Sequence, residues 1–208
     1  MGPRNGASAR AVQENFGIGS YRTAWKLLGK LRSCTVLSSR SQLSGEVEVD
    51  QAFLGGVNNK EIIGIAAEKR GPGTGRIRLK HLKNEKAEQI QGFILEAVEL
   101  GSKIISDRHK SYPSIVEKGY SYEAKKKPYF WEEVDGDDDR LLPRIGRAAA
   151  HLKRAYFGTY HGGMNMADIQ PYLDEFVFRY NRRRSGSRGL VFHRMVEAAV
   201  RSKPRPSA

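Results

Sequence analysis

The chain has 208 residues, with 36 lysines and arginines against 23 acidic residues and a formal net charge of +13 at pH 7. This length suits one main domain and one smaller one. The cationic excess favours an anionic partner, nucleic acid ahead of anionic lipid, over a purely small-molecule role.

The apolar patterning and the cysteine content exclude several classes of protein. No apolar run approaches the roughly 18 residues of a membrane span, and the first twenty residues lack the apolar core of a signal peptide. We therefore expect a soluble, intracellular protein. A single cysteine, Cys34, permits neither an internal disulfide nor a thiolate metal site, and we expect it to be a small buried hydrophobe.

Residues 1–33 resemble a helix-turn-helix, because two helical patterns flank the short turn FGIGS. Ser20 is placed to cap the second helix. An apolar stripe at helical spacing comprises Tyr21, Trp25, Leu28 and Leu31. The cations that fall toward the other side, available to DNA phosphates, are Lys26, Lys30 and Arg32. An ordinary helical hairpin is the alternative, and serine-rich residues 34–45 form a predicted linker.

From residue 46 the pattern changes to strands. EVEVDQAFLGG, EIIGIAAEKR and RIRLKHLK predict an antiparallel meander. The next segment predicts an amphipathic helix that ends at Gly101, with one apolar face formed by Ala87, Ile90, Ile94, Ala97 and Val98. KIISD then reads as a buried strand, SYPSIVEKG as a short helix or turn, and YSYEAKKK as a strand. The segments PRIGRAAAHLKRAYFG and DIQPYLDEFVFRYNRRR read as helices.

The order β-β-β-α-β-α-β-α predicts an α/β fold, in which helices cover a mixed sheet in the ribonuclease-H-like arrangement. We assign residues 46–200 to this domain and residues 201–208 to a basic tail. In such an order the first and fourth strands lie side by side.

The first strand carries Glu46, Glu48 and Asp50 at alternate positions, so all three point to one face. A solvated acidic face is the simplest explanation. Asp107, however, ends the strand KIISD, and functional side chains gather at such strand ends, although Asp107 also suits a helix cap or turn. Because the two strands are predicted neighbours, Asp50 and Asp107 could converge.

Converging carboxylates have a specific use in metal binding. Hard oxygen ligands hold Mg²⁺ and leave coordination positions for water and phosphate. Two such ions, about 3.5 to 4 Å apart, serve an in-line phosphoryl displacement.

Four segments resemble the motifs of a family of short prokaryotic insertion-sequence transposases of the DDE class, the ISXO type. GEVEVDQAFLGG is similar to the signature that opens their catalytic domain, and SDRHKSY is similar to their second-acid motif. LKRAYFGTYHGG with YLDEFVFRYNRR resembles their closing signature, and GIGSYRTAWKLLGKLR resembles the segment before the catalytic domain.

This resemblance implies a DNA transposase in the prokaryotic cytoplasm, associated with the nucleoid. It implies Asp50 and Asp107 as catalytic metal ligands for Mg²⁺ or Mn²⁺, with two ions expected. It also implies cleavage of a phosphodiester at the element end, followed by attack of the freed 3′-hydroxyl on target DNA. The expected partner is double-stranded DNA, bound by a homodimer or higher oligomer.

The sequence departs from the family pattern at three points. Gln51 replaces a usual glutamate, although its side chain should face away from Asp50. Gly146 stands where the third acid is usual and supplies no ligand. The zinc ribbon that commonly precedes the helix-turn-helix is absent, so we expect no zinc in this chain and a truncated or decayed copy.

The weaker candidates for a third ligand are His151 and Glu132. His151 lies about 140° around a helix from Gly146. Glu132 belongs to an acidic run expected to be a solvated loop, together with Glu133, Asp137, Asp138 and Asp139.

The remaining site candidates are polar. Predicted phosphate contacts comprise Lys110, Lys153, Arg154, Arg182, Arg183, Arg184 and Arg188, with surface solvation as the alternative for the arginine cluster. Glu48, His161 and Asn181 are supporting candidates; the alternative for Glu48 is a solvated side chain, and for His161 and Asn181 it is a hydrogen-bonded structural role. We expect six aromatic residues to pack in the core: Tyr156, Phe157, Tyr172, Phe176, Phe178 and Tyr180.

Three functions follow from these observations. The first is a DDE transposase, the second a DNA-binding remnant without catalysis, and the third a metal-dependent nuclease that cuts DNA without joining it.

Overall fold

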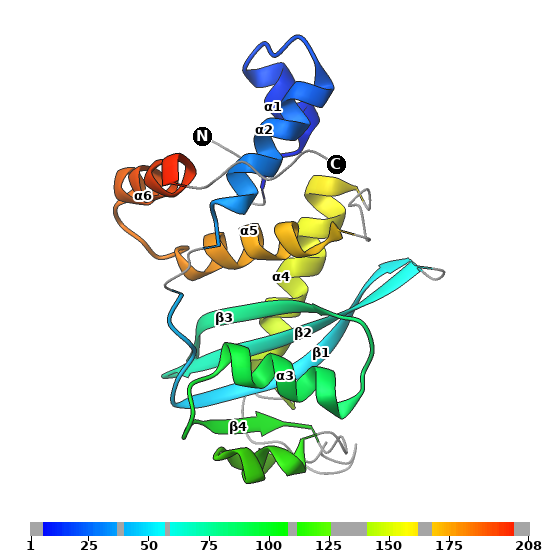
Figure 1. The fold of residues 1–208 in the computed structure, drawn as a ribbon, viewed down its shortest axis with the longest axis vertical. Coiled ribbons are helices and arrows are strands. Elements are labelled where there is room, and N and C mark those ends of the chain that lie inside the picture. Colours follow the sequence, from blue (N-terminus) through cyan, green and yellow to red (C-terminus); the bar gives the residue numbers. More distant parts are fainter. Residues whose placement is uncertain are drawn as a thin grey trace. The chain divides into compact units, whose positions relative to one another are not determined.

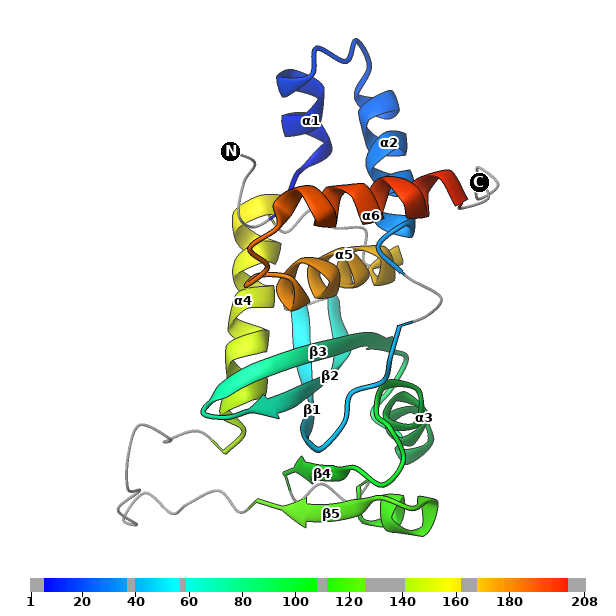
Figure 2. The same ribbon diagram turned by 90° about the vertical axis from the view of Figure 1, so that its left-hand side faces the viewer.

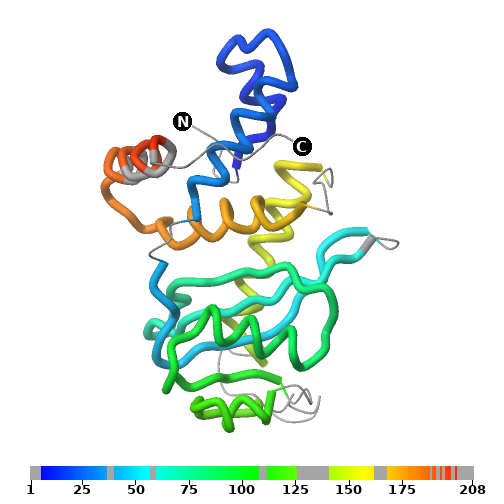
Figure 3. The backbone as a smooth tube through the Cα atoms, in the orientation of Figure 1, coloured from blue at the N-terminus to red at the C-terminus, as the bar shows by residue number. Residues whose placement is uncertain are grey.

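The computed structural model describes residues 6–36, 40–56, 59–107, 112–125, 141–161 and 168–201, most of which Figure 3 traces in colour. The chain forms two compact units. One consists of residues 41–153, and the other combines residues 1–40 with residues 154–208. This division is into compact units, and the domain boundaries predicted from the sequence stay a prediction.

A five-stranded mixed sheet forms the centre of the unit 41–153 (Figure 1). The strands are β1 (Glu46–Gly56), β2 (Asn59–Arg70), β3 (Gly73–Leu82), β4 (Lys103–Ser106) and β5 (Ser121–Ala124). Their order is β3-β2-β1-β4-β5. The first three strands pair antiparallel, while β4 pairs parallel with both β1 and β5. The predicted meander and the predicted neighbourhood of the first and fourth strands are confirmed.

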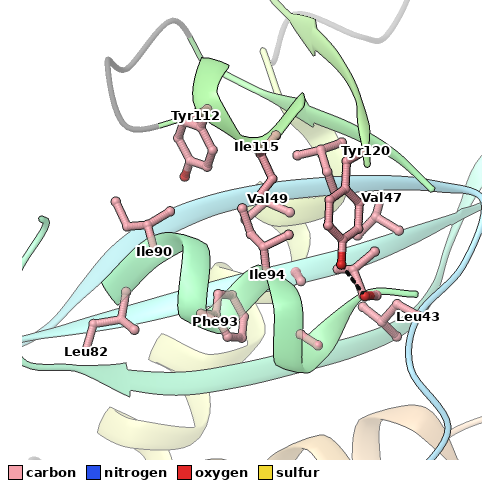
Figure 4. Close-up of a cluster of buried hydrophobic side chains, with 14 residues drawn as sticks. Leu43, Val47, Val49, Leu82, Ile90, Phe93, Ile94, Tyr112, Ile115 and Tyr120 are labelled. Atoms are coloured by element: carbon pink, nitrogen blue, oxygen red, sulfur yellow. Dashed lines mark hydrogen bonds between the residues drawn. The ribbon is translucent and has the colours of Figure 1, made fainter. Parts of the chain in front are cut away.

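The helix α3 (Ala87–Ala97) connects β3 to β4 and covers one face of the sheet (Figure 2). Ile90, Phe93 and Ile94 are buried in a cluster with Val47 and Val49, as Figure 4 shows. The backbone of β2 approaches this helix closely, because a Cβ on Gly64 would lie 3.0 Å from the Phe93 ring. The helix ends four residues before the predicted Gly101, since Val98 already has extended backbone angles.

The segment after β4 closes the same core. The 3₁₀ helix η1 (Pro113–Lys118) is the predicted short helical segment, and it brings the buried Ile115 over α3 (Figure 4). Tyr120 is also buried there, and its hydroxyl donates to the Val98 carbonyl at 2.8 Å.

The opposite face of the sheet meets the first turns of α4 (Pro143–Tyr160), so that α3 and these turns lie on different sides of it (Figure 2). Proline suits the first position of a helix, where its missing N–H costs nothing. Ile145, Ala148 and Leu152 recur at helical spacing and are buried. The sheet is therefore covered on both faces, as the sequence predicted.

The second unit is helical. It contains α1 (Ala9–Asn15), α2 (Tyr21–Ser33), α5 (Gln170–Asn181), α6 (Arg188–Arg201) and the end of α4. α1 and α2 form the predicted helix–turn–helix outline, with Ala9 and Val12 packed against Ala24 and Leu28. Cys34 is buried, as expected. None of the described helices has both the length and the apolar character needed to cross a membrane.

The structure confirms Ser20 as the N-cap residue of α2 and contradicts the prediction for Arg32. Ser20 occupies the N-cap position, but its side chain makes no capping hydrogen bond. The buried residues are Ala24, Leu28 and Arg32, whereas Tyr21 and Trp25 are about half exposed. Arg32 is not available to phosphates, because its Nε donates to Glu175 Oε2 at 2.8 Å and its guanidinium stacks on the Tyr172 ring at 4.0 Å.

The C-terminal aromatic residues mostly pack as predicted. Tyr156, Phe178 and Tyr180 are buried, and Tyr172 and Phe176 are half-buried. Phe157 is the exception at 57% exposure, and its ring meets that of Tyr156 edge-on at a centroid distance of 5.0 Å.

Candidate active site

Asp50 lies in β1, and Asp107 directly follows β4, the strand that pairs with β1. β1 and β4 pair parallel, and their last paired residues are Glu48 and Ile105. Asp50 and Asp107 each lie two residues beyond this last pair, and neighbouring strands lie about 4.8 Å apart. Asp50 lies on the face of β1 that carries Glu48, because side chains alternate along a strand. Both residues are half-buried, and Asp50 Oδ1 accepts a hydrogen bond from the Gln51 N–H at 2.8 Å.

A buried tyrosine hydroxyl lies near both acids. Burial raises the pKa of the Tyr112 hydroxyl, and the negative charges of Asp50 and Asp107 raise the pKa further. Gln51 Nε2 donates to this hydroxyl at 2.5 Å. Gln51 therefore faces the α3 side of the sheet, where Tyr112 is buried, and points away from Asp50, as predicted.

The end of β4 is fixed by the backbone of Asp107. Its carbonyl accepts hydrogen bonds from the Ser106 hydroxyl at 2.8 Å and from the Tyr122 hydroxyl at 2.9 Å. Tyr122 in turn stacks on Tyr112, with the ring centroids 6.4 Å apart. Asp107 thus leaves the sheet in a defined orientation and does not cap a described helix.

Glu48 connects the first strand to α4. Its side chain is 1% exposed, and its Oε2 accepts from the backbone N–H groups of Arg144 and Ile145 at 2.8 and 3.1 Å. Its Oε1 accepts from Arg144 Nη1 at 2.6 Å. The first N–H groups of a helix have no partner within the helix, so the Glu48 carboxylate caps α4 from a strand.

Glu46 lies on the same face of β1 but in a different environment. Its side chain is 40% exposed and pairs with Lys69 Nζ at 2.5 Å. The hydrogen bond from Lys69 lowers the pKa of the Glu46 carboxyl. Of the three acids on this face of β1, Glu46 is solvated, Glu48 is a buried anchor for α4, and Asp50 is the candidate metal ligand.

The third ligand is missing from the described part of the chain. Gly146 is the fourth residue of α4, next to the Ile145 amide that Glu48 holds, and it offers no side chain. His151 is exposed further along the same helix. Glu132, Glu133, Asp137, Asp138, Asp139 and Lys110 lie outside the described residues. Within the described ranges, no three His, Cys, Asp or Glu residues form a group that could hold a metal.

The predicted DNA-contacting residues have different surroundings. Lys26, Lys30, Lys153, Arg154 and Arg184 are exposed. Arg182 and Arg183 instead turn back on α5, donating to the carbonyls of Phe178 and Tyr180 at 3.2 and 2.9 Å and stacking on the same two rings. His161 is exposed at the end of α4 with a positive φ of 49°. Asn181 is the half-buried last residue of α5.

Two residues of this site had no recognisable signal in the sequence. Arg144 meets Glu48 across 96 positions of the chain, and Tyr112 meets Gln51 across 61. No local pattern marks such contacts, since they depend on how the strands pair. A proline at the start of α4 was the only local hint that a helix begins beside Arg144.

The strand order β3-β2-β1-β4-β5, with a crossover helix and helices on both faces, defines a ribonuclease-H-like fold. A chain of the simian T-cell lymphotropic virus intasome, in complex with PP2A regulatory subunit B56 gamma, has a similar fold. The TM-score is 0.50 at 12% identity, over 98% of this chain and 74% of that chain.

The chain belongs to the ISXO2-like transposase domain family, whose model matches residues 42–181. The catalytic core domain of HTLV-2 integrase, in complex with magnesium, is a weaker structural match. Its TM-score is 0.44 at 12% identity, over 72% of this chain and 94% of that chain. No curated protein matches the sequence.

Proposed function

We propose that this chain is a DNA transposase of an insertion sequence, in which Asp50 and Asp107 hold a divalent cation against the phosphodiester to be cut. The observation that supports the proposal is the parallel pairing of β1 with β4, whose last paired residues, Glu48 and Ile105, each lie two positions before one of the acids, in a chain of a transposase family. The reaction class is hydrolysis at the element end followed by strand transfer to target DNA.

The donor set fits Mg²⁺ or Mn²⁺, because both groups are carboxylates, the hard oxygen ligands that these cations prefer. When bound, such a cation neutralises the charge that develops on the phosphate and lowers the pKa of bound water. The chain's own contribution is positioning: hydrogen bonds to the Asp107 carbonyl fix one strand end, and Glu48 holds the first turn of α4 near the face of β1 that carries Asp50. Exposed Lys153 and Arg154 follow on α4 as phosphate contacts.

A DNA-binding remnant is the second candidate, and Gly146 is the observation that favours it. The described residues provide two acids at this site and no third ligand. Two carboxylates leave more of the coordination to water and phosphate, so cation binding would be weaker than with three. In that case duplex binding persists while cleavage is lost.

One assay separates these functions. The chain is incubated with Mn²⁺ and labelled duplex that carries the DNA flanking its coding sequence. Strand-transfer products support the transposase, cleavage alone supports a nuclease, and binding without either supports the remnant. Asp50→Asn and Asp107→Asn should each abolish cleavage, and cleavage that survives both substitutions would refute the metal site. Glu46→Gln is the matched control, since Glu46 is an exposed acid on the same face.

The same proposal includes assembly on DNA as a homodimer or higher oligomer in the prokaryotic cytoplasm. Sedimentation of the chain with and without duplex tests the oligomer, and a complex with one chain per duplex would contradict it.

A further inference from the structure

The backbone pairing of β1 with β4 ends before it reaches the two acids. Its last paired residues are Glu48 and Ile105, and Asp50 and Asp107 each lie two residues further along. β4 continues its pairing with β5 for one further residue, Ser106. The position of one acid relative to the other therefore depends on side-chain contacts beyond the paired residues.

Side chains on the α3 side of the sheet connect the two chain segments that carry the acids. Gln51 donates its backbone N–H to Asp50 Oδ1 at 2.8 Å and its Nε2 to the Tyr112 hydroxyl at 2.5 Å. The Tyr112 ring stacks on Tyr122 with an interplanar angle of 10°. The Tyr122 hydroxyl donates to the Asp107 carbonyl at 2.9 Å. These contacts run without a break from one acid to the other, and we call Gln51, Tyr112 and Tyr122 the tyrosine network.

The tyrosine network has little freedom to move. Tyr112 has no exposed surface and lies in the core cluster with Ile90 and Ile115 (Figure 4). The Tyr122 hydroxyl also accepts from the Ser106 hydroxyl at 3.1 Å. Side chains in a close-packed core cannot change rotamer without displacing their neighbours. The network is therefore rigid enough to fix the segments that it connects.

We propose that the tyrosine network positions the two acids, by holding the chain segments that carry Asp50 and Asp107 at a fixed separation. The network itself does not bind the cation, because the Gln51 side chain points to the face of β1 opposite Asp50. Carboxylates that are already in place bind a cation more tightly than carboxylates that must first become ordered. The inference rests on the proposed function, since the acids that it concerns are the proposed cation ligands.

Hydrogen exchange of the metal-free chain tests the network directly. Tyr112→Phe removes the hydroxyl and keeps the ring, so the hydrogen bond with Gln51 is lost. The amides of residues 50–52 and 105–107 should then exchange about fivefold faster, while amides at the centre of β2 and β3 keep their rates. Gln51→Glu should exchange like wild type, because a tyrosine hydroxyl can donate to a carboxylate as well as accept from an amide.

Tyr120→Phe is the matched control. Tyr120 is another buried tyrosine of the same core, and its hydroxyl donates to the Val98 carbonyl at 2.8 Å. This substitution also removes a buried hydrogen bond and keeps the ring, but the bond lies outside the tyrosine network. We expect a similar loss of thermal stability in both variants, and faster exchange near the acids only in Tyr112→Phe.

Titration calorimetry with Mn²⁺ measures the effect of the network on the cation. Tyr112→Phe and Gln51→Met should each weaken Mn²⁺ binding about tenfold, and Tyr120→Phe should leave the affinity unchanged. The double variant of Tyr112 and Gln51 should bind Mn²⁺ as weakly as either single variant, because the two side chains share one hydrogen bond.

The outcomes separate this inference from the proposed function. Exchange that rises equally across the sheet in Tyr112→Phe and Tyr120→Phe overturns the inference, since both tyrosines would then serve packing alone. Mn²⁺ binding that depends on Asp50 but is unchanged in Tyr112→Phe also overturns it. If Asp50→Asn leaves Mn²⁺ binding unaltered, the proposed metal site fails, and the exchange experiment alone decides whether the network fixes the two segments.

Discussion

At the scale of single residues, Glu46 and Glu48 show how burial separates two identical side chains. They share one face of β1, yet the Glu48 side chain is 1% exposed and the Glu46 side chain is 40% exposed. Glu48 satisfies two helix N–H groups and one guanidinium, whereas Glu46 has one surface partner. The same residue type therefore anchors a helix at one position and is solvated at the other.

Glu48→Ala should lower the free energy of unfolding by about 3 kcal/mol, because the mostly buried Arg144 loses its carboxylate partner and α4 loses its N-terminal cap. Glu46→Ala should leave the free energy of unfolding nearly unchanged, since an exposed ion pair contributes little. Urea unfolding of the two variants measures both. Equal losses in the two variants would show that Glu48 is not an anchor.

Glu68 makes stability depend on pH. Burial alone would raise the pKa of its carboxyl, but hydrogen bonds from the Arg76 side chain and from the Ser44 and Arg76 N–H groups outweigh burial and lower the pKa. Because the pKa is lowered in the folded state, the contribution of Glu68 to the free energy of unfolding is complete above about pH 4.3, the ordinary glutamate pKa. The contribution is lost as the pH falls through the folded-state pKa.

We therefore expect Glu68→Gln to lower the unfolding midpoint at pH 7 and to differ much less from wild type at pH 3. Thermal unfolding at the two pH values tests this. A difference of the same size at both would exclude Glu68 as the group responsible.

At the scale of elements, the first turn of α4 decides whether the site can be completed. Glu48 ties this turn to β1 two residues before Asp50, and Gly146 is the next residue after the two tethered amides. A side chain at position 146 would thus begin near the face of β1 that carries Glu48 and Asp50. The glycine also weakens the helix, since glycine is a poor helix former.

Gly146→Glu should bind Mn²⁺ about tenfold more tightly, a change of about 1.4 kcal/mol, because a third carboxylate joins Asp50 and Asp107. Gly146→Gln is the control, with the same shape and helix propensity but no charge. Titration calorimetry with Mn²⁺ compares them. Equal affinities would mean that position 146 does not reach the cation, even if the Asp50 and Asp107 site exists.

α2 illustrates why a pattern does not decide burial. Its apolar spacing is real, but only Ala24 and Leu28 meet α1, and Arg32 replaces an apolar residue on the buried side by pairing with Glu175. Tyr21 and Trp25 extend beyond that contact. Periodicity reports which residues share a face, and the neighbouring element decides how much of that face is covered.

At the scale of the whole molecule, the net charge of +13 should dominate DNA affinity. Several exposed cations are available for phosphates, so binding should weaken steeply with salt. With about six phosphate contacts, affinity should fall about 1,000-fold between 50 and 200 mM salt. Anisotropy of labelled duplex across this range measures the slope. A nearly flat slope would show that few phosphates are bound.

The sequence by itself determined the strand and helix order and the neighbourhood of the first and fourth strands, and it predicts that Asp50 and Asp107 converge. These follow from local periodicity and from the few ways in which such an order can fold. The opposite orientation of Gln51 also followed from the alternation of side chains along a strand.

Only the tertiary structure decided that Glu48 is a helix anchor, that Tyr112 lies beside both acids, and that Tyr21 and Trp25 face outward while Arg32 is buried. Each depends on a partner far away in the chain: Arg144 for Glu48, Glu175 for Arg32. The sequence does not distinguish a charged side chain that is solvated from one that is paired. Burial and pairing are set by packing between distant segments, which local spacing does not encode.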